Sequence, residues 1–237
     1  MAMRVVLEQG PKAKKYVAYA VDWPGWSRGA KTADGALETL EAYRERYQAV
    51  AVRAGFGSAF SDAGPIDVVE ERVGAPSTDF WAISFSASSL EQEPMDASEL
   101  ERKLVVLQAC WAYFDDVAAR VSPEMRKGPR GGGRDRDRII GHTIRVESED
   151  FAKRVGLVMP ERGALEPGAL APYRSAYLEA MRAYQRGEVK GRMLTWTLAF
   201  LVRHSGYHTM DHAWEMEDKD LSGETDQVAT ASPGLSR

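Results

Sequence analysis

The stretch RMLTWTLAFLVRHSGYHTMDH, residues 192–212, contains three of the four histidines of this 237-residue chain. His204, His208 and His212 follow one another in steps of four, and apolar residues around them have helical spacing. Steps of four bring side chains onto one helical face about one turn apart, so His208 and His212 are spaced to chelate one metal ion. The stretch therefore predicts a helix from Arg192 past His212 that carries a metal-binding stripe.

Three further helices are predicted in the same half of the chain. Apolar residues at three- and four-residue steps mark them over 97–121, 137–158 and 170–187. Each apolar stripe needs partners to bury it, so we expect residues 97–220 to form an all-α, antiparallel four-helix bundle. Residues 221–237 are small and polar, and we expect them to form a flexible tail.

The first 96 residues have a different pattern. Alternating apolar residues predict strands over 4–7, 16–22, 66–73 and 80–85. The first two are separated by Gly10-Pro11 and are expected to form a hairpin. One helix is expected from Thr32, as its N-cap, to Gly55. The sequence thus predicts an α+β domain over 1–96.

Composition and charge exclude several classes of protein. The chain has 31 Lys and Arg against 35 Asp and Glu, a formal net charge of -4, 44% hydrophobic residues and one cysteine, Cys110. The apolar fraction suffices for a folded core, no apolar run approaches the roughly 20 residues of a membrane span, and the mild acidity gives no reason to expect nucleic acid. With no internal disulfide and no secretory leader pattern, we expect a cytoplasmic protein.

His142, the remaining histidine, lies on the second predicted helix. Metal sites in bundles are assembled from facing helices, and a three-nitrogen site with His208 and His212 would leave positions open for water or substrate. On an ideal helix His142 falls away from the main apolar stripe, so either the helix is irregular or both of its faces are buried. A chance HxxxH pair, with residues 204–207 as a solvated turn, is the alternative.

Three other features bear on the chemistry. Asp211 and Glu215 are the nearest carboxylates in sequence, and each could orient an imidazole or form an exposed acidic face. The loop over 126–138 combines six basic residues with three consecutive glycines, which we interpret as a solvated connection; a ligand there would be a carboxylate or phosphate. Cys110 lies mid-helix and is interpreted as a buried apolar residue, not a nucleophile.

The run HTMDHAWEMED at 208–218, together with IIGH at 139–142, resembles the DinB-like superfamily over roughly residues 97–220. In that superfamily a four-helix bundle binds a divalent metal through one histidine on the second helix and an HxxxH pair on the last. The resemblance implies His142, His208 and His212 as ligands, zinc or nickel as the expected metal, and a homodimer. It assigns no position to His204. Members include transferases and isomerases that use a low-molecular-weight thiol, mycothiol or bacillithiol.

The run YAVDWPGWSRGAKT at 19–32, followed by ALETL at 36–40, resembles the HicB-like antitoxin module over about residues 3–55. The chain departs from that family at Gly35, where an acidic residue is usual. In that family the module binds a small toxin and is often followed by a DNA-binding segment, whereas a predicted bundle follows here. The resemblance implies a fused domain that binds a protein partner or acts as a lid.

Two functional hypotheses follow. The first is a metal-dependent enzyme that acts on a small molecule as a thiol-dependent transferase or isomerase, or as a hydrolase, because an open metal position lowers the pKa of a bound thiol or water. The second is a non-catalytic interaction protein, in which the HicB-like domain recruits a partner and the bundle is a dimerisation scaffold with a vestigial metal site. All four histidines lie in the predicted bundle, which favours the enzyme.

Overall fold

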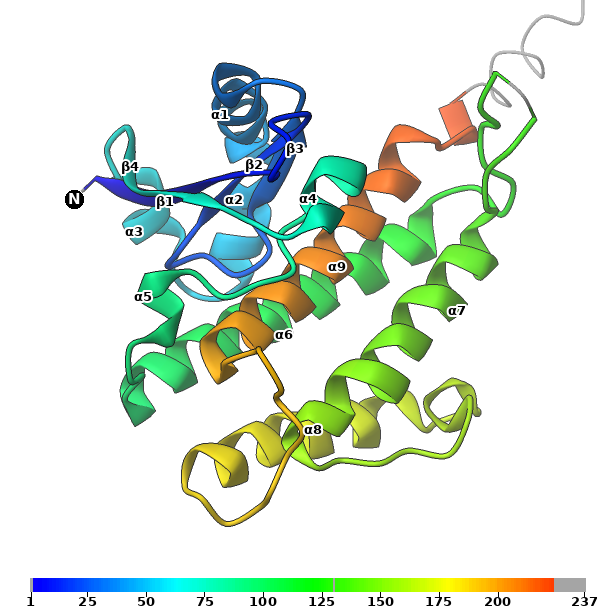
Figure 1. Ribbon diagram of the computed structural model, residues 1–237. Helices are drawn as coiled ribbons and strands as arrows, with labels where there is room; N and C mark the ends of the chain where they lie inside the picture. The colour runs from blue at the N-terminus through cyan, green and yellow to red at the C-terminus, as the bar shows by residue number, and fades with distance from the viewer. Residues whose placement is uncertain (1, 130, 224–237) are drawn as a thin grey trace, which may run out of the picture.

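The computed structural model describes residues 2–129 and 131–223. A small mixed sheet forms in the N-terminal part, and the C-terminal part is mostly helical (Figure 1). Most of the predicted tail over 221–237 lies outside the described residues. Within them, every helix is too short or too polar to cross a membrane.

The sheet has four strands in the order β3-β2-β1-β4. They are β1 Met3–Gln9, β2 Tyr16–Ala20, β3 Ser27–Ala30 and β4 Ile66–Val73. β1 and β2 pair antiparallel, which confirms the predicted hairpin, and β4 pairs parallel to β1. Successive side chains alternate across the sheet, so Val5 and Leu7 enter the main core while Val6 and Glu8 face the other side.

Five short helices accompany the sheet. They are α1 Ala33–Ala42, α2 Arg44–Arg53, α3 Gly57–Ser61, α4 Pro76–Trp81 and α5 Ser89–Gln92. The single helix predicted from Thr32 to Gly55 is wrong in one respect: the chain breaks at Tyr43, so α1 covers β2 and β3 while α2 packs on the long helix that follows.

The strand predicted over 80–85 is also wrong, because α4 occupies its first part. Pro76 stands at the start of α4, where its missing N–H costs nothing. The carboxylate of Asp79 accepts hydrogen bonds from the backbone N–H groups of Lys12 and Lys14, which ties α4 to the hairpin turn. The aromatic pair Phe80 and Trp81 therefore ends on the surface rather than in a strand.

The C-terminal part contains four main helices. They are α6 Ala97–Arg120, α7 Arg136–Val146, α8 Leu170–Gln185 and α9 Leu198–Asp218. The second is regular only to Val146; a π-helical turn, η1 Glu147–Phe151, and 3-10 turns, η2 Ala152–Val155 and η3 Gly163–Leu165, follow it. The last begins six residues later than predicted, since the Thr197 side chain caps it by accepting from the N–H of Phe200.

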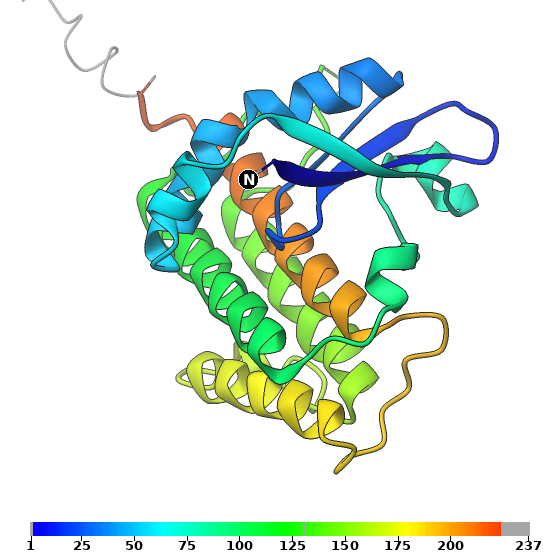
Figure 2. The same ribbon diagram turned by 90° about the vertical axis from the view of Figure 1, so that its left-hand side faces the viewer.

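Two apolar cores share α6 and α9. The first lies toward the sheet and joins Trp26, Tyr47 and Phe60 to Phe114 of α6 and Trp214 of α9. The second lies toward α7 and α8. In both views α6 and α9 lie between the sheet and α8 (Figure 2). The first core thus runs across the boundary predicted between residues 96 and 97.

Two glycines allow the sheet-bearing part to approach α9 closely. A Cβ on Gly206 would lie 2.9 Å from the backbone nitrogen of Gly25, and Gly25 itself has a φ of +98°, which favours glycine. The turn after β2 therefore contacts α9 between His204 and His208 in sequence. Residues 204–207 are helical and buried, so the solvated-turn alternative is wrong.

Candidate metal centre

Three histidines from two helices meet in the C-terminal part. His142 lies in the middle of α7, and His208 and His212 lie one turn apart on α9. The Nε2 atoms of His142 and His208 are 3.4 Å apart, and one ring nitrogen from each of the three residues lies within 4.8 Å of the others. The structure therefore brings together the three side chains that the sequence predicted.

The donor set fits a metal such as zinc. A tetrahedral ion with bonds of about 2.0–2.1 Å separates its nitrogen ligands by roughly 3.3 Å. His142 and His208 already have that separation, and the ring centroids of His142 and His208 lie 5.0 Å and 4.7 Å from that of His212. Three imidazoles leave further coordination positions open, which is the arrangement of catalytic rather than structural zinc sites.

Burial keeps two of these imidazoles neutral. It lowers the pKa of His142 to about 4, helped by the charges of His212 and Arg134. Burial also lowers the pKa of His208 well below its ordinary value, with His212 again contributing. Neutral imidazole is the form that binds a metal, so both side chains are ready to bind one at neutral pH.

Glu215 orients His212. Its Oε2 lies 2.8 Å from Nδ1 of His212, and its Oε1 accepts from Lys219 at 2.6 Å. Burial alone would raise the pKa of Glu215, but these hydrogen bonds lower it to about 2, so the group is a carboxylate. With Nδ1 engaged, Nε2 of His212 is left for a metal. Asp211, the other predicted candidate, instead pairs with Arg28 at 3.0 Å.

A cavity of about 720 Å³ opens beside the three histidines. Its walls come from Trp81, Ile83 and Phe85 of the N-terminal part, from the stretch between Val146 at the end of α7 and Arg154, and from the stretch between Trp196 and His212, together with Arg134 and His142. Apart from the histidines, Asp211 and Arg134, these wall residues were not predicted from the sequence as part of a site. Neither the π-helical turn nor the loop after α4 has a spacing in the sequence that reveals its position.

The burial of both faces of α7 explains the placement of His142. Ile139 packs in the first core and Ile144 in the second, so both faces of α7 are used, and the regular helix ends four residues after His142. The extra residue in the turn directs Phe151 toward α9, where its ring centroid is 5.6 Å from that of His208. Of the two explanations offered by the sequence, the burial of both faces is confirmed, whereas α7 is regular at His142 and becomes irregular only after Val146.

His204 lies on the same helix but in different surroundings. Its ring is stacked on Phe200 at 5.2 Å and also contacts Phe85, Phe151 and Trp196. Its Nδ1 is buried without a hydrogen-bond partner among the described residues. Burial lowers its pKa to about 3, followed by the effect of Arg203. His204 is therefore a neutral wall residue of the cavity and not part of the three-histidine cluster.

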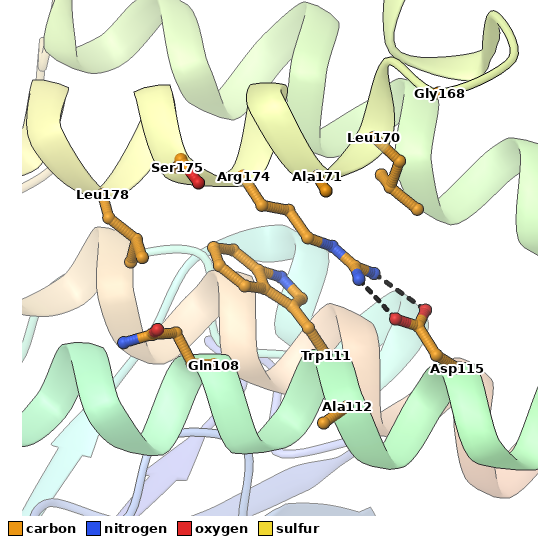
Figure 3. Close-up of a pocket in the computed structure, with 10 residues that line it drawn as sticks. All are labelled: Gln108, Trp111, Ala112, Asp115, Gly168, Leu170, Ala171, Arg174, Ser175 and Leu178. Carbon is orange, nitrogen blue, oxygen red and sulfur yellow. Dashed lines mark hydrogen bonds and ion pairs between the residues drawn. The ribbon is translucent and has the colours of Figure 1, made fainter.

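A second depression lies between α6 and α8 (Figure 3). Arg174 crosses it to Asp115 with two hydrogen bonds of 2.5 Å and 3.0 Å, and its guanidinium lies over the ring of Trp111. The charged groups of this groove thus face each other rather than an open space. We do not assign it a ligand.

Among the described residues, the remaining sequence candidates take no part in the site, apart from Arg134. Cys110 is buried, and this burial raises the pKa of its thiol. Its sulfur contacts the carbonyl of Pro24. In the loop over 126–138, of which Arg130 lies outside the described residues, Lys127 pairs with Asp135 and Arg134 with Glu215 at 3.3 Å. Arg134 therefore reaches the centre through Glu215.

No protein-family model matches the chain, and searches of curated proteins and of solved structures likewise find no match. The DinB-like and HicB-like resemblances therefore stay predictions, as do the homodimer and the protein partner.

Proposed function

We propose that this protein is a metal-dependent enzyme of the DinB-like type that acts on a small molecule, and that α6, α7, α8 and α9 are the four helices of that bundle. The observation that carries the proposal is the cluster of His142, His208 and His212 beside the cavity. The helix order supports it too, with one histidine on the second long helix and the HxxxH pair on the last. Zinc and nickel are the expected metals.

The chemistry proposed is a transfer or isomerisation that uses a low-molecular-weight thiol such as mycothiol, or a hydrolysis. A divalent metal bound here would supply an open position that lowers the pKa of a thiol or water. The chain's own residues would do the rest: Glu215 fixes the orientation of His212, and the ring of Phe151 packs against that of His208. A cavity of about 720 Å³ has room for a small molecule.

Elemental analysis tests the proposal. Protein purified without a polyhistidine tag is expected to hold about one equivalent of metal per chain, and the His208→Ala/His212→Ala double variant none. The matched control is His204→Phe, which removes a histidine from the same helix but fits its ring of aromatic neighbours; it should retain the metal. Metal-loaded and chelated protein would then be compared in assays that combine thiols with electrophilic substrates.

An alternative result would redirect the interpretation. If the wild-type chain holds no metal and takes up none when zinc or nickel is added, the histidine cluster is not a metal site. The interaction protein with a vestigial site would then be the better hypothesis, and the proposed enzyme would be rejected.

A further inference from the structure

A continuous path of aromatic rings leads from the surface to the histidine cluster. Phe80 and Trp81 are exposed, and their ring centroids are 4.8 Å apart. The next steps are 5.9 Å from Trp81 to Phe85 and 5.1 Å from Phe85 to His204. These separations are those of rings in contact, so the path is continuous, and the one polar ring in this half is the imidazole of His204.

The inner half of the path continues to the proposed ligands. From His204 the next ring is Phe151 at 5.3 Å, and from Phe151 it is His208 at 5.6 Å. Trp196 lies beside this half, 5.1 Å from His204 and 5.7 Å from Phe151. Most of these rings line the same cavity, so a flat apolar group inside it would contact aromatic faces and edges along its length.

Arg154 adds a positive charge to this aromatic wall. Its guanidinium carbon lies 4.3 Å from the ring centroid of Trp196, and its NH1 makes only two long contacts, of 3.4 Å, with the carbonyls of Arg192 and Met193. Within residues 2–129 and 131–223 no carboxylate pairs with it. Arg154 therefore has hydrogen-bond donors available for a ligand.

The other charged groups of the cavity are engaged or exposed. Arg134 is bound to Glu215, and Asp211 is bound to Arg28. Asp150 lines the cavity as well, but it is exposed to water, which screens its charge. Among the described lining residues, Arg154 is thus the basic group best placed to bind an anion.

We propose that the cavity binds a small aromatic carboxylate, with its ring against Phe85, Phe151 and Trp196 and its carboxylate on Arg154. The ligand's role as a substrate rests on the proposed function, but its binding to the cavity does not. It also assigns the N-terminal part a task in the site, because Trp81 and Phe85 supply the outer half of the path.

Calorimetric titration of the zinc-loaded full chain with 2-naphthoate and with the neutral 2-naphthamide tests the inference. We expect naphthoate to bind about tenfold more tightly, the effect of one charge-assisted hydrogen-bonding group. Arg154→Gln should remove that preference and leave naphthamide binding unchanged, whereas Arg154→Lys should keep part of it. Lys153→Gln, which removes an exposed charge from the neighbouring position, is the matched control and should change nothing. Phe85→Ala should weaken both compounds.

The same titrations on the His208→Ala/His212→Ala variant separate this inference from the proposed function. A preference that persists there and disappears in Arg154→Gln supports the inference even if the protein binds no metal. A preference that survives Arg154→Gln but is lost in the double variant places the carboxylate on the metal, which overturns the inference and supports the enzyme. Equal binding of the two compounds, or no binding, overturns the inference.

Discussion

The two faces of α9 border regions that are built in different ways. On the face toward the sheet, Trp26, Tyr47 and Phe60 pack with ring centroids 5.2 to 5.8 Å apart. The indole N–H of Trp26 donates to the carbonyl of Leu40 at 2.9 Å, and the hydroxyl of Tyr47 donates to the carbonyl of Pro24 at 2.7 Å. This region is filled; the two donors named have partners, and the indole nitrogen of Trp214 on α9 has none among the described residues.

The face toward α7 instead borders a cavity that is lined by histidines. His142 and His208 turn neutral imidazoles toward each other, and Nδ1 of His204 is buried without a partner among the described residues. Burying such groups costs stability, which a fold tolerates at sites of function rather than in a core chosen for stability. The comparison therefore assigns stability to one face of the helix and ligand binding to the other.

Removing a large ring from the filled region should have the largest effect on the free energy of unfolding. Trp26 is 1% exposed, and Trp26→Ala deletes its ring contacts and leaves a cavity. We expect the free energy of unfolding, measured by urea denaturation, to fall by about 3–5 kcal/mol. Metal content should stay at one equivalent under conditions in which the variant is folded. A loss below about 1 kcal/mol would show that this core is not the main source of stability.

On the other face, a small change at Glu215 should act on the metal and not on the fold. Glu215→Gln keeps the shape of the side chain but removes the charge that faces Nδ1 of His212. We expect zinc affinity, measured by competition with a chelator, to fall about 10- to 100-fold. Asp211→Asn is the control, since Asp211 pairs with Arg28 and not with a histidine. Equal losses in both variants would contradict the orienting role.

The features that could be predicted from the sequence are those that depend on local patterns. Strands and helices with a regular apolar period, such as Ile66–Val73, Ala97–Arg120 and Leu170–Gln185, lie where the pattern placed them. The HxxxH spacing likewise brought His208 and His212 together, because it depends only on helical geometry. These features are local, so a single sequence contains them.

Features that depend on contacts distant in the sequence could not be predicted in this way. The helix break at Tyr43 follows from the packing of α2 on α6, and α4 is held by the bonds of Asp79 to the hairpin turn. The π-helical turn that directs Phe151 toward His208 has no periodic signal. The cavity wall was missed because Trp81, Phe85 and Trp196 come together only in the folded chain.

A fall in pH should lower the free energy of unfolding by an intermediate amount, through His204 on the cavity side of α9. The pKa of His204 is about 3 in the folded chain and about 6.5 in an unfolded one, so below pH 6.5 only the unfolded state gains a proton. The stability that its burial permits is therefore present above pH 6.5 and is lost as the pH falls.

Between pH 7 and pH 5 this single group should lower the free energy of unfolding by at most about 2 kcal/mol. Over the same pH range, the free energy of unfolding of His204→Phe should fall less than that of the wild type, by the amount that His204 contributes. Urea denaturation of the metal-free proteins at both pH values measures the difference. Parallel losses in the wild type and the variant would mean that folding does not lower the pKa of His204.

The smallest effect is expected in the groove between α6 and α8 (Figure 3). Asp115 is about half exposed, so water screens its pair with Arg174, and ion pairs of this kind contribute at most about 1 kcal/mol. Asp115→Asn should therefore change the free energy of unfolding only slightly, and should leave both zinc content and naphthoate binding as in the wild type. A change in ligand binding would show that this groove communicates with the histidine cluster, and the assignment of function to one face of α9 would then be too narrow.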